Sequence, residues 1–296
     1  MAEPSTSDRV PAALRSLLPA RFRANIPIVP VVRLSGVIGI SSPLKPGLTL
    51  ANVAHSLEWA FAMRHIRAVA LLINSPGGAA VQSYLIHRRI RALAGEKKIP
   101  VLAFVEDVAA SGGYMIACAA DEIVADASSI VGSIGVVGGS FGFDKLIEKV
   151  GIERRLYTSG ENKAMLDPFL PEKAEDVERL KAIQREIHES FIALVKARRG
   201  DKLDSRESVL FSGAYWTGQR GRELGLVDAV GDMRAVLRER YGEKVRTPLI
   251  AERGLFGRRV VGVSCGGLGQ LWSGSSLADD MVATLEARAL WSRYGL

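Results

Sequence analysis

The sequence predicts an α/β protein built around a mostly parallel β-sheet. From about Ile26 onward, apolar runs typical of buried strands alternate with segments of helical periodicity. Such alternation is typical of crossover βαβ connections. The strand runs are apolar throughout, as expected for strands covered by helices on both faces of a sheet. With 296 residues, 48% of them hydrophobic, the chain is long enough to bury a large core.

The first half of the chain contains most of the expected elements. Each apolar run is short enough for a strand and is followed by a Gly, Pro or Asn turn or by a helical stripe. We expect strands in 26–40, 67–78, 99–107 and 152–160, two short strands in 121–137, and helices in 49–63, 79–93, 114–120 and 143–151.

The second half begins with a long charged helix. Pro171 lies at its start and Gly200 at its end, which is the usual punctuation of a helix. The stretch 212–232 then closes the main domain. We therefore divide the chain into a flexible N-terminal arm, 1–25, a main domain, 26–245, and a C-terminal extension, 246–296, which is Gly/Ser-rich before a short amphipathic helix at 277–293. One apolar stripe follows the long helix: Val177, Leu180, Ile183, Ile187, Phe191, Leu194 and Val195.

Composition excludes several classes of function. The net charge is +7, but the basic residues are spread along the chain rather than clustered with aromatics, so we expect no nucleic-acid partner. Peripheral contact with anionic lipid is the lesser alternative. Two cysteines, Cys118 and Cys265, form no CxxC pair, and the histidines have no metal-ligand spacing, so we expect no metal. The histidines are His55, His65, His87 and His188.

The sequence shows neither a signal peptide nor a transmembrane span. The first residues lack the basic and then apolar layout of a signal peptide. The longest uncharged run, 68–86, is interrupted by Asn-Ser-Pro-Gly-Gly, which splits it into a strand, a turn and a helix. We therefore expect a cytoplasmic protein.

Two glycine-rich turns lie at strand ends, 74–80 and 109–114. In an open α/β sheet, the crevice at the carboxyl ends of the strands is the usual binding site. Ser111 follows a buried strand and precedes an apolar helix, as nucleophiles do in several hydrolases. The amide of Gly112, with an amide of the Pro-Gly-Gly turn, suits an oxyanion hole. Simple turns and a simple helix cap at Ser111 remain the alternatives.

A serine nucleophile also needs a base. His55, His65 and His87 fall inside expected helices, and His188 lies in the long charged helix. A lysine can replace histidine where burial disfavours its charged form. Lys163 follows a turn and precedes an apolar Ala-Met-Leu run. The alternative is that Lys163 is an ordinary exposed lysine.

Five segments together resemble a known family. They are INSPGG (73–78), ASGGYMIACAADEIVA (110–125), IVGSIGVV (130–137), SGENKAMLDPF (159–169) and WTGQRGRELGLVDAVG (216–231). Over roughly 28–245 the chain resembles the signal peptide peptidase A family, the S49 serine peptidases, of the Clp/crotonase superfamily. The resemblance implies a Clp/crotonase-like spiral of βαβ units.

The resemblance also implies roles for particular residues. It makes Ser111 the nucleophile and Lys163 the general base of a Ser–Lys dyad. The oxyanion amides become those of Gly78 and Gly112, and Ser133 becomes the serine that hydrogen-bonds the lysine. No cofactor is implied. The implied substrates are extended apolar peptides, such as cleaved signal peptides or membrane-protein fragments.

The sequence differs from common family members in two respects. It lacks their N-terminal membrane anchor, and it carries one copy of the peptidase module. Short members assemble into homo-oligomeric rings with active sites near subunit boundaries, so we expect a ring and an inactive lone subunit. Two alternatives remain open: a crotonase-type acyl-CoA enzyme that uses the same turns, and a non-catalytic scaffold that binds membrane proteins.

Overall fold

A computed structural model describes residues 26–39, 47–204, 207–250 and 274–296. Within these residues, eight strands form one sheet with the order β6-β5-β3-β2-β1-β8, and β4 pairs with β3 and β7. Every pairing is parallel except that of β5 with β6. The α/β class with a mostly parallel sheet is therefore confirmed. The strands are β1 (Val31–Ser35), β2 (Val69–Ser75), β3 (Val101–Ala110), β4 (Glu122–Ala125), β5 (Ile130–Gly132), β6 (Tyr215–Thr217), β7 (Ala229–Val230) and β8 (Leu249–Ile250).

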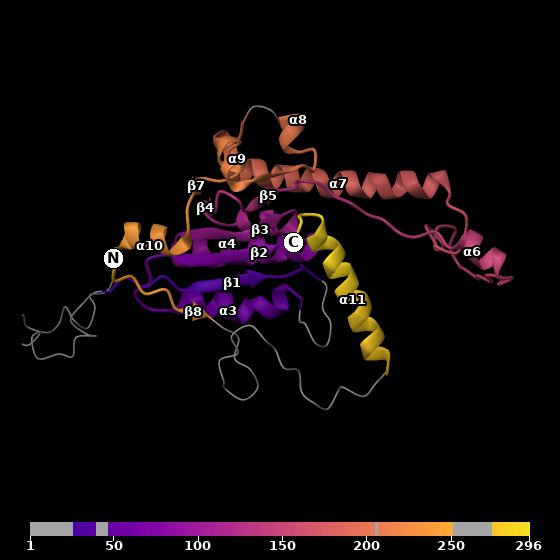
Figure 1. The fold of residues 1–296 in the computed structure, drawn as a ribbon, viewed down its shortest axis with the longest axis horizontal. Helices are drawn as coiled ribbons and strands as arrows, with labels where there is room; N and C mark the ends of the chain where they lie inside the picture. Colours follow the sequence, from indigo (N-terminus) through magenta and orange to yellow (C-terminus); the bar gives the residue numbers. More distant parts are fainter. Residues whose placement is uncertain (1–25, 40–46, 205–206, 251–273) are drawn as a thin grey trace, which may run out of the picture.

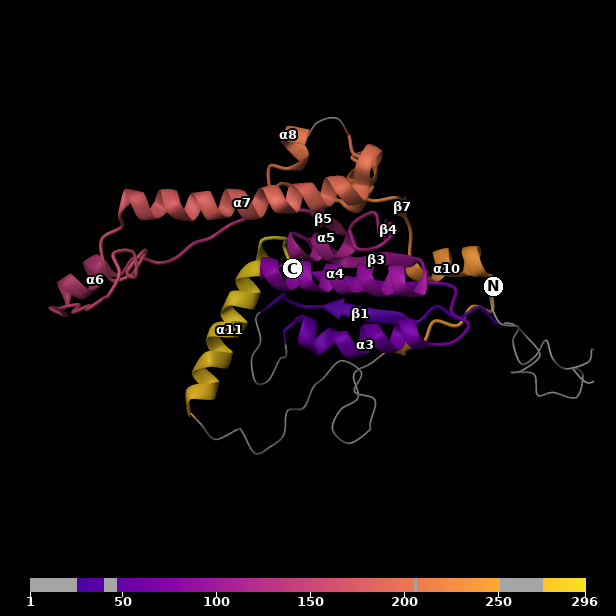
Figure 2. The ribbon, with the colours of Figure 1, turned by 180° about the vertical axis from the view of Figure 1, so that it is seen from behind.

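Helices cover both faces of the sheet (Figures 1 and 2). The larger core lies between the strands and α3, α4, α5 and the end of α7, whereas a smaller one lies between the other face and α10. The apolar strand residues therefore point into one or other core, which explains their lack of alternation. The helices are α3 (Leu50–Ala62), α4 (Ala80–Lys97), α5 (Gly112–Ala117), α6 (Asp144–Lys149), α7 (Ala174–Arg199), α8 (Glu207–Leu210), α9 (Gly218–Glu223), α10 (Met233–Tyr241) and α11 (Gly274–Ser292).

Most expected elements are present within a few residues of their expected bounds, but the strand at 152–160 is wrong. That stretch has no regular structure and is exposed along its whole length. The edge of the sheet beside β5 is instead occupied by β6, antiparallel to it, from the closing stretch 212–232. Charged residues in 152–160 leave too little apolar surface for a buried strand. Residues 1–25, the glycine-rich part of the extension and Cys265 lie outside the described residues.

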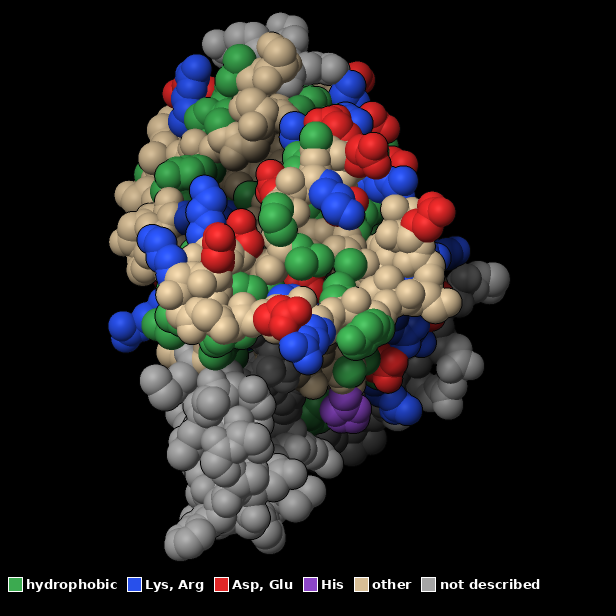
Figure 3. All heavy atoms as spheres, turned by 90° about the vertical axis from the view of Figure 1, so that its right-hand side faces the viewer, with side chains coloured by type: hydrophobic (Ala, Val, Ile, Leu, Met, Phe, Trp, Pro, Cys, Tyr) green, Lys and Arg blue, Asp and Glu red, His purple; other side chains and the backbone are tan. Residues whose placement is uncertain are grey.

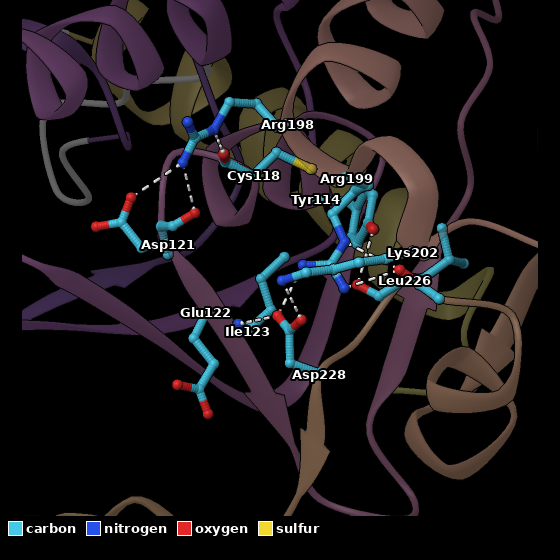
Figure 4. A network of polar contacts seen from close by, with 12 residues as sticks. Tyr114, Cys118, Asp121, Glu122, Ile123, Arg198, Arg199, Lys202, Leu226 and Asp228 are labelled. Atoms are coloured by element: carbon cyan, nitrogen blue, oxygen red, sulfur yellow. Dashed lines mark hydrogen bonds and ion pairs between the residues drawn. The ribbon is translucent and has the colours of Figure 1, made fainter.

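A buried ionic network fixes the C-terminal end of α7 to the sheet (Figure 4). The Arg199 guanidinium donates to the Gly225 carbonyl oxygen at 2.9 Å and to the Asp228 carboxylate at 2.7 Å. Asp228 also accepts from the Ile123 amide and from the Lys202 amine. Burial raises the pKa of Asp228, but hydrogen bonds from Arg199 and Lys202 outweigh burial and hold that pKa below its usual value. The network therefore anchors α7 to β4 and the loop before β7.

The two ends of α7 differ in what they contact. Near the C-terminal end, Phe191, Leu194 and Val195 are buried in the main core. Towards the N-terminal end, Ile183 is about half exposed, and the helix extends beyond the sheet (Figure 1). At 1.5 Å per residue, its 26 residues span about 39 Å. The apolar stripe expected on this helix is therefore buried over only part of its length.

Candidate active site

Ser111 lies at the sharp turn between β3 and α5. Its backbone has φ +52° and ψ −121°, a conformation that side-chain-bearing residues rarely adopt and that costs free energy. The Ser111 amide donates to the Gly132 carbonyl oxygen at 2.8 Å, and the Ser111 carbonyl oxygen accepts from Met115 at 3.0 Å. The side chain forms no capping hydrogen bond and is half-buried. The simple-cap interpretation of Ser111 therefore has no support in the structure.

The Pro-Gly-Gly turn after β2 packs directly against Ser111. A Cβ atom added at Gly77 would lie 2.8 Å from the Ser111 Cβ and 3.0 Å from the Gly112 nitrogen. Gly78 has φ +139°, and a Cβ atom there would clash with the carbonyl oxygen of Ile38. A Cβ atom at Gly112 would likewise clash with Ser83. Gly77 thus allows the two turns to approach each other, whereas Gly78 and Gly112 pack closely against Ile38 and Ser83.

Two backbone amides beside Ser111 have no acceptor among the described residues. The neighbouring amides are occupied, since Gly77 donates to Ser75 Oγ at 3.2 Å and Ala79 donates to the Ile38 carbonyl oxygen at 2.8 Å. Within the described part of the chain, no hydrogen bond is formed by the amides of Gly78 and Gly112. Unpaired amides on the two turns that meet at a nucleophile are what an oxyanion hole requires.

Ser133 lies on the other side of Ser111. It directly follows β5, whose Gly132 pairs with Ala110 of β3, so Ser133 and Ser111 follow neighbouring strand ends. Ser133 has φ +53°, and its amide donates to the Ala214 carbonyl oxygen at 2.7 Å. Its hydroxyl lies 3.3 Å from the hydroxyl of Tyr294, a residue that the sequence analysis did not single out. No local pattern marks Tyr294, because its partner lies 161 residues earlier in the chain.

Lys163 does not join this group within a single chain. It lies in residues 138–172, which we call the projecting segment and which includes α6 at the far end of α7 (Figure 1). Its side chain is exposed, and its amide donates to the Gly160 carbonyl oxygen at 3.2 Å. Among the described residues, its amine has no hydrogen bond or ion pair. The structure therefore brings together Ser111, Gly78, Gly112 and Ser133, but not Lys163.

The projecting segment is held mainly by contacts within itself. Arg154 and Asp167 form an ion pair at 2.9 Å, and the rings of Phe143 and Phe169 lie 5.6 Å apart. None of its residues is buried. This end of the molecule exposes hydrophobic side chains between charged ones (Figure 3). The large exposed hydrophobic residues of the segment are Phe141, Phe143, Leu146, Val150, Ile152, Leu156, Tyr157 and Phe169.

The histidines do not supply an alternative base in this arrangement. His188 Nε2 lies 3.0 Å from the carbonyl oxygen of Ile134, not beside Ser111. His87 is buried in α4, where burial and then the charges of Arg198 and Arg91 lower its pKa to about 4. Over the described ranges, no cluster of three or more His, Cys, Asp or Glu side chains suits a metal ion. No helix in those ranges is long and apolar enough to cross a membrane.

Comparison with known proteins identifies the family. The sequence model of peptidase family S49 matches residues 94–245, which include Ser111, Gly112, Ser133 and Lys163. The chain belongs to peptidase family S49. The resemblance found in the sequence is therefore confirmed, and a serine peptidase is the class that the family supports. The matched region begins at residue 94, so it does not include Gly78.

Relatives with protease names agree with the S49 assignment. The chain is 34% identical over 213 residues to the chloroplastic serine protease SPPA of Arabidopsis thaliana, covering 69% of this chain and 31% of that protein. It is 35% identical over 191 residues to a putative protease of Methanocaldococcus jannaschii, covering 64% of this chain and 60% of that protein.

A more similar relative carries a different name. Over 291 residues the chain is 55% identical to a protein of Brucella abortus named Na(+)/H(+) antiporter NhaA, covering 97% of this chain but 39% of that protein. The chain thus matches one part of that longer protein and spans less than two thirds of each of these three relatives.

Proposed function

We propose that this S49 protein is a serine endopeptidase in which Ser111 is the nucleophile and Lys163 the general base. The observation that carries the proposal is the strained turn of Ser111, set beside amides of Gly78 and Gly112 that find no acceptor in the described part of the chain. A crotonase-type acyl-CoA enzyme would also use such amides, but it would leave the strained serine without a role. Backbone strain is retained where the surrounding structure supports a function.

Catalysis would proceed through an acyl-enzyme. As the Ser111 oxygen attacks the scissile carbonyl carbon, the neutral Lys163 amine takes the hydroxyl proton. The resulting oxyanion accepts hydrogen bonds from the amides of Gly78 and Gly112. The C–N bond then breaks as the Lys163 ammonium returns the proton to the leaving amine. In the second half, Lys163 takes a proton from water, hydroxide oxygen attacks the acyl carbon, and Ser111 leaves with the proton restored.

The dyad would form between two copies of the chain. A lysine serves as a base only where burial disfavours its charged form, whereas Lys163 is exposed in one chain. The projecting segment also exposes a run of large hydrophobic residues, which is typical of a protein–protein contact. Docking this segment onto the crevice of a neighbouring copy would bury both and bring Lys163 to the partner copy's nucleophile. A closed ring satisfies every such contact.

The proposed substrates are extended apolar peptides, such as cleaved signal peptides or fragments of membrane proteins. A cavity of about 460 Å³ beside the middle of β2 and β3 is lined by Leu72, Phe104, Ile130 and Met233, which suits apolar side chains. Carboxylates of Glu106, Asp107, Asp126 and Asp232 lie around the same cavity. A cytoplasmic location, with anionic lipid as a peripheral partner, stays a prediction.

The proposal is tested by covalent labelling combined with peptide hydrolysis. A fluorophosphonate probe should label Ser111, and mass spectrometry identifies the modified residue. Ser111→Ala and Lys163→Ala should each lower kcat/KM on a fluorogenic apolar peptide by on the order of a thousandfold or more. Lys149→Ala, an exposed lysine of the same segment, is the matched control and should keep wild-type activity.

Each contrary result has a defined meaning. Full activity in Lys163→Ala would exclude the Ser–Lys mechanism. Turnover of acyl-CoA thioesters without peptide hydrolysis would favour the crotonase-type enzyme. Absence of both labelling and hydrolysis in the assembled wild-type protein would favour the non-catalytic scaffold.

A further inference from the structure

The strand that presents Ser111 contains a β-bulge before its end. Val69 of β2 pairs with Val101 of β3, but further along Ser75 of β2 pairs with Ala109 of β3. Over the same length of sheet, β3 therefore has two more residues than β2. Bulges beside active sites often re-aim a side chain. Two extra residues, rather than one, keep the alternation of side chains between the two faces of the sheet.

The bulge brings Ser111 level with the Pro-Gly-Gly turn. Ser75 and Ala109 are paired, and Gly77 and Ser111 each follow two residues later. A Cβ atom added at Gly77 would lie 2.8 Å from the Ser111 Cβ, so the two residues face each other. If the register of the first part of β3 continued, Ala109 would lie opposite Gly77 instead. The bulge thus decides which residue of β3 meets the turn.

The bulge is also the place where β3 changes its second neighbour. Residues 102–105 pair with β4, whereas residues 108–110 pair with β5, the strand that leads to Ser133. The last part of β3 is therefore placed between β2 and β5. Its register against both strands sets where Ser111 lies relative to the Pro-Gly-Gly turn and to Ser133.

Side chains from both sides hold the bulge. Asn74, the residue of β2 opposite it, donates from Nδ2 to the Asp107 carboxylate at 2.6 Å and accepts from the Val108 amide on Oδ1 at 3.3 Å. On the other side lies Ser129, directly before β5, which is buried and donates from its hydroxyl to the Glu106 carbonyl oxygen. These contacts compensate for the regular ladder that a bulge interrupts.

We propose that Asn74, Asp107 and Ser129 are positioning residues, which hold Ser111 against the Pro-Gly-Gly turn by fixing the bulge in β3. This inference rests on the proposed function, in which Ser111 is the nucleophile. The three side chains act through the backbone of β3 and not on the reacting atoms. A rate that depends on the exact place of the nucleophile is sensitive to such a contact, because a misplacement of about 1 Å costs on the order of a hundredfold.

Exchanging the donor and the acceptor tests the Asn74–Asp107 pair. Asn74→Asp sets two carboxylates side by side without a donor between them, so the bulge should lose its register. Asp107→Asn keeps an oxygen that accepts from Asn74. In the double variant, the carboxylate introduced at position 74 accepts from the amide introduced at position 107 and still accepts from the Val108 amide.

The expected pattern is a loss that the second substitution reverses. On a fluorogenic apolar peptide, kcat should fall about a hundredfold in Asn74→Asp, with KM unchanged. It should stay within about threefold of wild type in Asp107→Asn and return to that range in the double variant. The control is Glu58→Gln, which removes a carboxylate from an exposed pair with Arg89 and should keep the wild-type kcat.

A second variant tests the other side of the bulge. Ser129→Ala removes the hydroxyl that donates to the Glu106 carbonyl oxygen, and kcat should fall about tenfold. Thermal unfolding of each variant shows whether a loss of fold contributes. If Asn74→Asp does not fold, recovery of both folding and kcat in the double variant supports the proposal, and failure of that recovery overturns it.

Hydrogen exchange measures the position of Ser111 without catalysis. The Ser111 amide donates to the Gly132 carbonyl oxygen at 2.8 Å, so peptides that cover 106–113 should exchange about tenfold faster in Asn74→Asp. The double variant should exchange at the wild-type rate. This pattern, with no hydrolysis in any variant, would support the positioning role and overturn the peptidase.

Three results would overturn the positioning role and leave the peptidase intact. The first is wild-type kcat and wild-type exchange in Asn74→Asp. The second is a double variant that is no more active than Asn74→Asp. The third is a change confined to KM, because Asp107 also lines the proposed substrate cavity and would then act there.

Discussion

The crevice around Ser111 and the projecting segment around Lys163 are built in opposite ways. At the crevice, backbones approach so closely that Gly77, Gly78 and Gly112 have no room for a side chain. In the projecting segment, no residue is buried, and Lys163 makes no side-chain hydrogen bond within the described chain. The comparison teaches that one chain packs the surroundings of Ser111 by itself, whereas it leaves Lys163 exposed.

The origin of the difference lies in how the segments bury apolar surface. Parallel strands with helices on both faces fix their carboxyl ends through two cores. The projecting segment is carried instead by the outer part of α7, where charged residues predominate and Ile183 is 49% exposed. Its own large apolar residues stay exposed in the single chain.

Mixing two inactive variants is the strongest test of whether Ser111 and Lys163 act from different copies of the chain. If each site takes Ser111 from one copy and Lys163 from another, a 1:1 mixture of Ser111→Ala and Lys163→Ala chains should regain activity in about a quarter of its sites. The mixture is dissociated, reassembled and assayed for peptide hydrolysis. Each variant taken alone through the same treatment is the control. No recovery in fully reassembled material would place both residues in the same chain.

A charge introduced on the projecting segment should disrupt assembly without unfolding the subunit. The test substitution is Val150→Asp, at a position that is 61% exposed in the single chain. Because burying an unpaired carboxylate at a contact between copies is costly, assembly should fail. We expect smaller particles by analytical ultracentrifugation and at least about a tenfold loss of peptidase activity, with unchanged thermal unfolding of the subunit. Val282→Asp, which is 55% exposed on α11, is the matched control. Normal assembly of Val150→Asp would exclude this surface as the contact.

Removing the anchor of α7 should cost stability at the amino ends of the strands, away from the crevice. Arg199→Leu leaves the half-buried Asp228 carboxylate without its buried partner, which should cost about 3 kcal/mol, the low end for breaking a buried pair. Lys202→Ala removes the exposed partner of the same carboxylate and should cost about 0–1 kcal/mol. Urea unfolding measures both free energies. Equal losses of stability in the two variants would show that the Arg199–Asp228 pair contributes no more than the exposed Lys202–Asp228 pair.

Acid should lower the free energy of unfolding through the protonation of His87. Its pKa is about 4 in the folded chain against about 6.5 when unfolded, so between these values the unfolded state binds more protons. The free energy of unfolding should therefore fall as pH drops from about 6.5 to 4, by on the order of 3 kcal/mol. His87→Leu should remove this part of the pH dependence, and His55→Leu, at an exposed position, should keep it. If the pH dependence of stability were unchanged in His87→Leu, groups other than His87 would cause it.

The sequence predicts the crevice better than it predicts the projecting segment. Strand and helix periods are local signals, so the elements around Ser111 and the glycine turns follow from a few residues each. The expected strand at 152–160 fails because its charged residues leave too little apolar surface for burial against the sheet, which periodicity alone does not reveal. The contact of Tyr294 with Ser133 depends on how distant segments meet, which no short pattern records.

The positive φ at Ser111 means that the chain would be more stable with glycine at this position. Glycine adopts this conformation freely because it has no Cβ atom. Ser111→Gly should therefore raise the free energy of unfolding by about 1 kcal/mol relative to Ser111→Ala, which keeps the Cβ atom, as thermal unfolding can measure. A serine at this position is therefore kept at a cost in stability that glycine would not carry.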